Sequence, residues 1–209
     1  MKSSSAEELG ALHEERKARI RSRLAEFARV PPERYLYELL YCLMTPQSSA
    51  ENAEKAVAAL ERLRFAERGA DPEPVLRAKA HYIRFHRTKA KRLLGAREQL
   101  PAIREALARG GPPAALREWL VEHVKGLGYK EATHFLRNVG MNGTLAILDR
   151  HILRNLQRLG AIRSVPASLT RRRYLSIEGK FRRLAEAFRI PMNELDLLFW
   201  SMETGVVRK

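Results

Sequence analysis

Lys130 and Asp149 are the two residues whose types and positions suit covalent chemistry. Lys130 lies in the first turn of a predicted helix, where the positive end of the helix dipole disfavours a second positive charge. With Lys125 and several arginines nearby, we expect its ammonium to lose a proton readily, and a neutral lysine amine is a nucleophile. Asp149 directly follows the apolar run 145–148, a position that suits a helix N-cap. A carboxylate has two oxygens, so Asp149 could both cap a helix and assist the amine.

A glycine-containing turn precedes Lys130. Gly126 and Gly128 separate a helix predicted over residues 114–125 from one starting near Tyr129. Glycines allow a sharp turn and close approach of a ligand, and the free N–H groups of the following helix favour an anion such as a DNA phosphate. An ordinary corner between two helices would also use glycines for packing. The turn alone therefore leaves both interpretations open.

The elements that must position these residues are predicted to be helices. Residues 6–30 suggest a charged surface helix, and Pro31 and Pro32 end it. The spacing of Leu36, Leu39, Leu40 and Leu43 predicts a buried helical face. Further helices are expected to about residue 64 after a capping box of Ser48 with Glu51, from Asp71, over 87–108 with a possible break at Pro101, and from about 150, 168 and 192. Only residues 144–148 have a β leaning, so the predicted fold class is all-α.

The charge balance suggests a polyanionic partner. The 209 residues contain 39 Lys and Arg against 24 Asp and Glu, which gives a formal net charge of +15 and a pI of about 10.5. Nucleic acid ranks before a membrane as the partner of such a chain. A general bias of composition towards arginine would produce the same excess.

A single cysteine limits the possible sites. Cys42 lies in an apolar run and is expected to be a buried, inert thiol, which excludes an internal disulfide and any four-cysteine zinc or iron–sulfur site. The polar N-terminus lacks a signal-peptide core, and no apolar run approaches the roughly 20 residues that span a bilayer. We expect a soluble, intracellular protein with no membrane partner.

The segment Gly126-Leu127-Gly128-Tyr129-Lys130, followed by Asp149 after an apolar run, resembles the helix-hairpin-helix signature of the DNA glycosylase superfamily that includes endonuclease III. Residues 124–156, 84–90 and the ending at Lys209 more closely resemble the small archaeal-type 8-oxoguanine DNA glycosylases. The resemblance implies a two-lobed helical fold, with residues 1–47 and 148–209 in one lobe. Residues 48–147 would form a helical barrel lobe containing the hairpin, 114–140. The superfamily's C-terminal four-cysteine cluster is absent, and Lys125 stands where proline is frequent.

The resemblance also implies an activity. Lys130 matches the catalytic lysine of the bifunctional members and Asp149 their aspartate. Lys130 would attack the sugar C1′ of an extruded nucleotide, the base would leave, and a Schiff base would form and undergo β-elimination. The implied partner is double-stranded DNA containing oxidised guanine, bound by a monomer in the cytoplasm or nucleoid. No metal or organic cofactor is required.

Further roles follow from the resemblance. Gln47 matches the loop whose side chain fills the space left by the extruded base, although a polar turn residue would look the same. Phe85 and Trp200 match positions that stack on the base, although both suit a helical core. The terminal carboxylate of Lys209 would accept a hydrogen bond from N7–H of 8-oxoguanine, although a frayed tail is the usual fate of a terminus.

The remaining residues would contact the DNA backbone. Predicted phosphate contacts are Lys125, Gly126, Gly128, Arg150, Arg154 and the run 171–173. The backbone carbonyls of Glu122, Val124 and Leu127 would hold a structural monovalent cation, as is frequent in this superfamily.

Two alternatives remain open from the sequence. The same fold could act on another lesion, such as an oxidised pyrimidine. A non-catalytic helix-hairpin-helix module would bind DNA with Gly126 and Gly128 but would not need Lys130 or Asp149.

Overall fold

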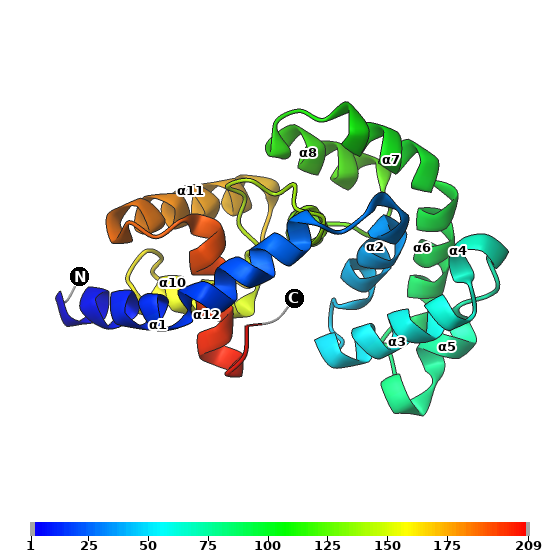
Figure 1. The fold of residues 1–209 in the computed structure, drawn as a ribbon, viewed down its shortest axis with the longest axis horizontal. Coiled ribbons are helices and arrows are strands. Elements are labelled where there is room, and N and C mark those ends of the chain that lie inside the picture. Colours follow the sequence, from blue (N-terminus) through cyan, green and yellow to red (C-terminus); the bar gives the residue numbers. More distant parts are fainter. Residues whose placement is uncertain (1–2, 208–209) are drawn as a thin grey trace. The chain divides into compact units, whose positions relative to one another are not determined.

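The computed structural model describes residues 3–207, with side chains from residue 7 onwards. Every regular element in this range is a helix (Figure 1). The all-α class predicted from the sequence is therefore confirmed. Residues 145–149, which include most of the stretch with a β leaning, have no regular secondary structure.

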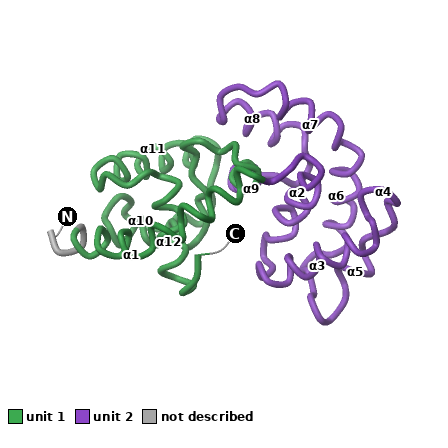
Figure 2. Tube along the Cα trace, in the orientation of Figure 1, with its two compact units in different colours: residues 1–29, 136–209 green, residues 30–135 purple. Residues whose placement is uncertain are grey.

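The chain divides into two compact units. Unit 1 comprises Met1–Arg29 and Leu136–Lys209, and unit 2 comprises Val30–Phe135 (Figure 2). We expected boundaries after residues 47 and 147. The structure instead groups α2 (Tyr35–Met44) with unit 2, because α2 packs against α3 (Ala50–Arg62) and α6 (His86–Glu98). Helix α9 (Tyr129–Asn138) begins in unit 2 and ends in unit 1.

Unit 1 is built around α12 (Met192–Thr204), which packs against α1 (Ser3–Ala28), α10 (Arg150–Arg158) and α11 (Arg171–Phe188). Leu195, Leu198 and Phe199 on α12 are fully buried. The Phe181 ring from α11 stacks on Phe199 with their centroids 5.7 Å apart. This core supports the segment that leads into Asp149.

Helix α1 is more than the charged surface helix expected from the sequence. Leu9, Ile20 and Phe27 form a widely spaced buried stripe. Next to it, the buried His13 lies 2.7 Å from Glu194 on α12, and Arg21 donates to the same carboxylate at 2.9 Å. The stripe is hard to recognise in the sequence because charged residues fill the intervals between its apolar members.

Unit 2 is built around α2, all ten residues of which are buried. The leucine spacing predicted one buried face, but α2 is covered on every side, and Cys42 is buried as expected. The other helices of this unit are η1 (Pro32–Arg34), α4 (Phe65–Arg68), α5 (Glu73–Arg77), η2 (Lys79–His81), α7 (Leu100–Arg109) and α8 (Pro113–His123).

Two helix ends differ from the sequence-based expectation. Ser49, not Ser48, caps α3, because its side chain accepts from the N–H of Asn52 at 3.1 Å. The break in 87–108 falls at Gln99, between α6 and α7. Pro101 then occupies the first turn of α7, where a missing N–H costs no hydrogen bond.

No helix within residues 3–207 has both the length and the apolar character needed to cross a bilayer.

Candidate active site

The turn between α8 and α9 in unit 2 has the form of a helix-hairpin-helix. Helix α8 ends at His123, and the N–H of Leu127 donates to the carbonyl of Val124 at 3.1 Å. Gly126 has φ +105°, a conformation that favours glycine. A Cβ on Gly126 would lie 2.5 Å from Cδ of Arg92, so the Arg92 side chain from α6 packs directly against the turn.

Lys130 is the second residue of α9. Its ammonium lies 3.5 Å from a carboxylate oxygen of Glu131, and its side chain is one-quarter exposed. The other Glu131 oxygen accepts from the N–H of Gly128 at 3.2 Å, which caps the start of the helix. The sequence analysis missed Glu131. Its position three residues after Gly128, where a capping-box carboxylate stands, is the signal that could have revealed it.

Asp149 is the N-cap of α10 in unit 1, as its position predicted. Its backbone is extended, and Oδ1 accepts from the N–H of Ile152 at 2.9 Å. No hydrogen bond reaches Oδ2 within the described range, and the residue is half-buried. One oxygen therefore stabilises the helix start while the other stays available for chemistry.

Three buried side chains form hydrogen bonds with the backbone of the irregular segment before Asp149. Glu178 accepts from the N–H of Ala146 at 2.8 Å, and Asp196 accepts from the N–H of Ile147 at 3.3 Å. The Tyr174 hydroxyl donates to the Ala146 carbonyl at 2.5 Å, and it accepts from the N–H of Leu148 at 3.2 Å. These side chains satisfy the backbone groups that a neighbouring strand would otherwise satisfy, which explains why a β-like run forms no sheet.

Asp196 places a second carboxyl group near Asp149. It is buried and lies 3.3 Å from Arg137. Burial raises the pKa of Asp196 to about 7; the Arg137 guanidinium opposes this rise, and the charge of Asp149 adds to it. Neither Asp196 nor Arg137 stands out in the sequence, because their partners are distant along the chain.

Gln47 and Phe85 occupy two exposed turns of unit 2. Both have positive φ, +56° and +60°, which is uncommon for residues with a side chain. Ser48 connects the turns, since its hydroxyl accepts from the N–H of Arg84 at 3.0 Å. Phe85 is 50% exposed, so it is not the core aromatic of the alternative interpretation.

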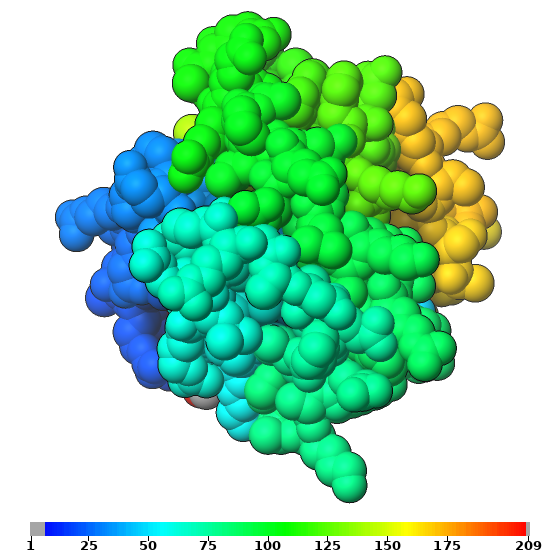
Figure 3. Space-filling view, turned by 90° about the vertical axis from the view of Figure 1, so that its right-hand side faces the viewer, coloured from blue at the N-terminus to red at the C-terminus, as the bar shows by residue number. Residues whose placement is uncertain are grey.

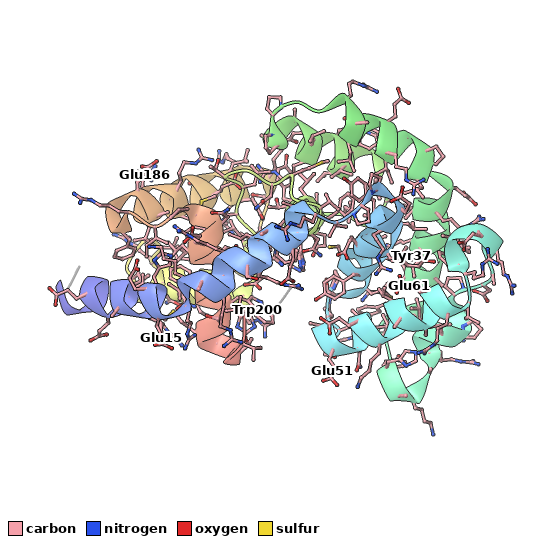
Figure 4. The ribbon with its side chains drawn as sticks, in the orientation of Figure 1. Glu15, Tyr37, Glu51, Glu61, Glu186 and Trp200 are labelled. Atoms are coloured by element: carbon pink, nitrogen blue, oxygen red, sulfur yellow. The ribbon has the colours of Figure 1, made fainter. Side chains whose placement is uncertain are left out.

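Trp200 lies on α12 of unit 1 (Figure 4), with its ring in an edge contact with His151 at a centroid distance of 6.0 Å. It is half-buried, and Arg150 and Arg154 are exposed on α10. The run 171–173 is exposed at the start of α11. Lys209 lies outside the described residues.

A basic groove runs along one side of α6. Its volume is about 520 Å³, and Arg87, Lys91, Arg92 and Lys125 line it, together with the single acid Glu98. Long side chains project from the cyan-to-green surface of unit 2 (Figure 3). The groove joins Lys125 of the hairpin to α6, which begins directly after Phe85.

The backbone carbonyls of Glu122, Val124 and Leu127 are the predicted cation ligands at the hairpin. Among residues 3–207, the carbonyls of Glu122 and Leu127 accept no hydrogen bond, whereas that of Val124 accepts one from Leu127. A carbonyl oxygen has two lone pairs, so each of the three retains at least one that no protein donor uses. The described residues contain no cluster of His, Cys, Asp or Glu suited to a metal.

A family model described as 8-oxoguanine DNA glycosylase matches residues 20–190, most of the chain. The chain belongs to the 8-oxoguanine DNA glycosylase family. The resemblance found in the sequence is thereby confirmed, as is the helix-hairpin-helix fold.

Relatives of this glycosylase family support the assignment along the whole chain. An 8-oxoguanine DNA glycosylase/AP lyase of Fusobacterium nucleatum is 39% identical and covers 97% of this chain and 96% of its own length. One from Methanocaldococcus jannaschii is 36% identical over 85% of this chain and 84% of its own.

Solved structures agree with the same family. The 8-oxoguanine DNA glycosylase of Thermotoga maritima has a TM-score of 0.87 at 33% identity and covers 99% of both chains. The M. jannaschii glycosylase/lyase in complex with a 15mer DNA containing 8-oxoguanine has a TM-score of 0.85 at 34% identity, covering 96% of this chain and 99% of its own.

The predicted site residues are divided between the two units. Unit 2 contains Gln47, Phe85, the hairpin glycines and Lys130. Unit 1 contains Asp149, the arginines of α10 and Trp200. Lys130 and Asp149 thus belong to different units.

Proposed function

We propose that this chain removes 8-oxoguanine from double-stranded DNA and then cuts the strand at the resulting abasic site. The observation that carries the proposal is the position of Lys130, in the first turn of α9 directly behind the glycine turn of the hairpin. A hairpin that binds a backbone phosphate would bring the adjacent sugar towards this amine.

In the proposed reaction, the neutral Lys130 amine attacks C1′ of the damaged nucleotide. A bond forms between Nζ and C1′, and the glycosidic bond breaks with its electron pair leaving on the base. Asp149 stabilises the positive charge that develops on the sugar and takes up the proton released by the amine. Its oxygen Oδ2, which makes no hydrogen bond within residues 3–207, is suited to this task.

The sugar ring then opens to a Schiff base on Lys130. Loss of a proton from C2′ and departure of the 3′ phosphate complete the β-elimination, and water releases the lysine. Each step uses side chains and water, so the reaction needs no organic cofactor or catalytic metal. A monovalent cation on the carbonyls of Glu122, Val124 and Leu127 would bridge the hairpin to a phosphate.

The target base must leave the helical stack before it can react. In our proposal, Gln47 fills the vacated space, and Phe85 and Trp200 stack on the extruded base. The half-exposed ring of Phe85 supports this role, and the guanidinium of Arg84 lies over the ring at 4.8 Å from its centroid. The carboxylate of Lys209 would accept from N7–H of the lesion, a group that guanine lacks.

Backbone contacts in the proposal come from exposed basic groups and from the glycine turn of the hairpin. They are Lys125, Gly126, Gly128, Arg150, Arg154 and the run 171–173. Such contacts position the enzyme without reading sequence. We propose that the protein acts on chromosomal DNA inside the cell as a monomer.

A panel of duplex oligonucleotides tests this function. The duplexes carry 8-oxoguanine, an oxidised pyrimidine, a pre-formed abasic site or no damage. We expect base removal and strand cleavage with 8-oxoguanine, cleavage of the abasic site, and neither with undamaged DNA. If the oxidised pyrimidine is removed faster than 8-oxoguanine, the preferred substrate is another lesion. Binding without any cleavage would indicate a non-catalytic DNA-binding module.

A further inference from the structure

Lys89 on α6 is buried although lysine is among the residues least often found inside proteins. Its side chain is 2% exposed. The ammonium donates to the carbonyls of Met44 and Pro46, both at 2.6 Å, and to the hydroxyl of Ser48 at 3.3 Å. These three acceptors use all three ammonium hydrogens, so Lys89 is not placed as a second nucleophile.

The three acceptors surround Gln47. Met44 and Pro46 precede it and Ser48 follows it, so the ammonium holds the turn on both sides of a residue with φ +56°. Residues with a side chain sparsely populate this left-handed region and persist there when neighbouring contacts hold them. The Gln47 side chain is exposed, which leaves it free to enter DNA.

The same lysine reaches the Phe85 turn by two routes. Its backbone N–H donates to the Phe85 carbonyl at 2.9 Å. Its ammonium also donates to the Ser48 hydroxyl, which in turn accepts from the N–H of Arg84 at 3.0 Å. Arg84 directly precedes Phe85, whose φ is +60°. Lys89 and Ser48 thus form one partly buried cluster, the Lys89–Ser48 cluster, that ties both left-handed turns together.

We propose that Lys89 is a positioning residue that fixes the Gln47 turn and the Phe85 turn in one joint arrangement for base extrusion. The inference rests on the proposed function, because it assigns Gln47 to the vacated space and Phe85 to the extruded base. Both roles are needed at the moment of base extrusion. Because one ammonium holds both turns, neither turn has to become ordered separately when the base is extruded. Preorganisation of this kind reduces the cost of binding the extruded state.

The charge of Lys89 fits this role. Burial lowers its pKa to about 8, with the charges of Arg92 and Lys130 acting in the same direction and that of Glu131 opposing them. The ammonium form still predominates at neutral pH, where its hydrogen bonds to carbonyls are charge-assisted and strong.

Replacing Lys89 with methionine keeps the length of the side chain and removes its hydrogen bonds. We expect Lys89→Met to lower single-turnover excision of 8-oxoguanine at least about tenfold. Cleavage of a pre-formed abasic site should fall less, because no damaged base must be received by Phe85. Lys55→Met is the matched control, since Lys55 is exposed on α3 and pairs with the exposed Glu51 one turn earlier.

A mutant cycle separates positioning from general destabilisation. In a Gln47→Ala/Phe85→Ala background, Lys89→Met should add less than about a twofold loss of excision, because the two side chains that it positions are already absent. Fluorescence of 2-aminopurine opposite the lesion should show less extrusion in Lys89→Met than in wild type. Equal losses in both backgrounds, or extrusion equal to that of wild type, would overturn the proposal.

Ser48→Ala keeps the test decisive if Lys89→Met fails to fold. This variant retains the Lys89 bonds to the two carbonyls and removes the Ser48 hydroxyl, which accepts from both Lys89 and the N–H of Arg84. Its loss of excision should vanish in a Phe85→Ala background and persist in a Gln47→Ala background. The reverse pattern would contradict the cluster.

Excision of 8-oxoguanine by the wild-type protein distinguishes a failure of this inference from a failure of the proposed function. Wild-type protein that leaves 8-oxoguanine in place refutes the proposed function. Wild-type excision with a Lys89→Met rate equal to that of Lys55→Met refutes the role of Lys89 alone.

Discussion

At the residue scale, Asp149 uses Oδ1 to cap α10 and leaves Oδ2 without a hydrogen bond in the described range. Asparagine caps helices about as well as aspartate, whereas alanine costs about 1 kcal/mol. We therefore expect Asp149→Asn to keep its unfolding temperature and Asp149→Ala to lose several degrees. Base removal should slow strongly in both, because neither carries the charge. Thermal unfolding with single-turnover kinetics checks this, and a large loss of stability in Asp149→Asn would favour a purely structural role.

Lys89 makes the free energy of unfolding depend on pH. Its pKa falls from 10.5 in the unfolded chain to about 8 in the folded protein, so the unfolded state binds more protons between these values. Stability contributed by this group is therefore lowest below pH 8 and recovers as the pH rises towards 10.5. The total change is at most about 3 kcal/mol.

Denaturant unfolding of wild type and Lys89→Met across pH 7–11 measures this dependence. The difference between the two proteins should shift in favour of wild type as the pH rises. Other lysines and tyrosines titrate in both proteins and cancel from the difference. A difference that stays constant across the range would show that the pKa of Lys89 is not lowered.

Residues with local signals could be predicted, and residues with distant partners could not. Asp149 was predicted as a cap because the residue that it caps lies three positions away. The partners of Lys89 lie 41 to 45 positions away, and Asp196 bonds to a backbone group 49 positions away. Such pairs form only when the helices pack, so no spacing in the sequence indicates them.

At the element scale, the two hairpin glycines should differ in how well they tolerate a side chain. Gly126 has φ +105° and contacts Arg92, whereas a Cβ on Gly128 would meet only the flexible end of Glu131 at 3.0 Å. We expect Gly126→Ala to weaken binding to damaged and undamaged duplex alike, by roughly tenfold, and more than Gly128→Ala does. Equilibrium titrations with both duplexes test this. A loss confined to the damaged duplex would argue against a phosphate-binding turn.

The basic groove along α6 should contact DNA phosphates. The logarithm of the affinity falls as the logarithm of the salt concentration rises, and each lost phosphate contact makes this slope less steep by about 0.9. Lys91→Gln should therefore reduce the slope by about one for undamaged duplex, whereas Arg109→Gln, on the exposed end of α7, should leave it unchanged. Binding measured at several salt concentrations decides between them; equal slopes in wild type and Lys91→Gln would remove the groove from the DNA interface.

Helices were easier to predict than their ends and burial. Proline and glycine marked most of the breaks, because they remove a donor or adopt positive φ. The segment before Asp149 has the composition of a strand, yet Tyr174, Glu178 and Asp196 occupy its backbone groups. Helix α2 showed a one-sided leucine pattern but is covered all round. Coverage depends on the neighbours that a helix acquires, and a single helix does not specify them.

At the scale of the whole molecule, the all-α class follows from periodicity, while the division into units does not. One boundary follows Arg29, close to the predicted break at Pro31, but the other falls within α9, a continuous helix with no break to mark it. The net charge of +15 agrees with a nucleic-acid partner. The assignment of chemistry to Lys130 came from one short segment, in which the turn, the helix start and the lysine occur together.

Covalent trapping with borohydride tests the central claim most directly, because it reduces the Schiff base between a lysine and the sugar to a stable adduct. Wild type and the control Lys55→Gln should both be trapped on a duplex containing 8-oxoguanine. Lys130→Gln should give no adduct while binding the duplex with little loss, because phosphate contacts dominate affinity. An adduct of undiminished yield in Lys130→Gln would contradict the assignment of Lys130 as the nucleophile.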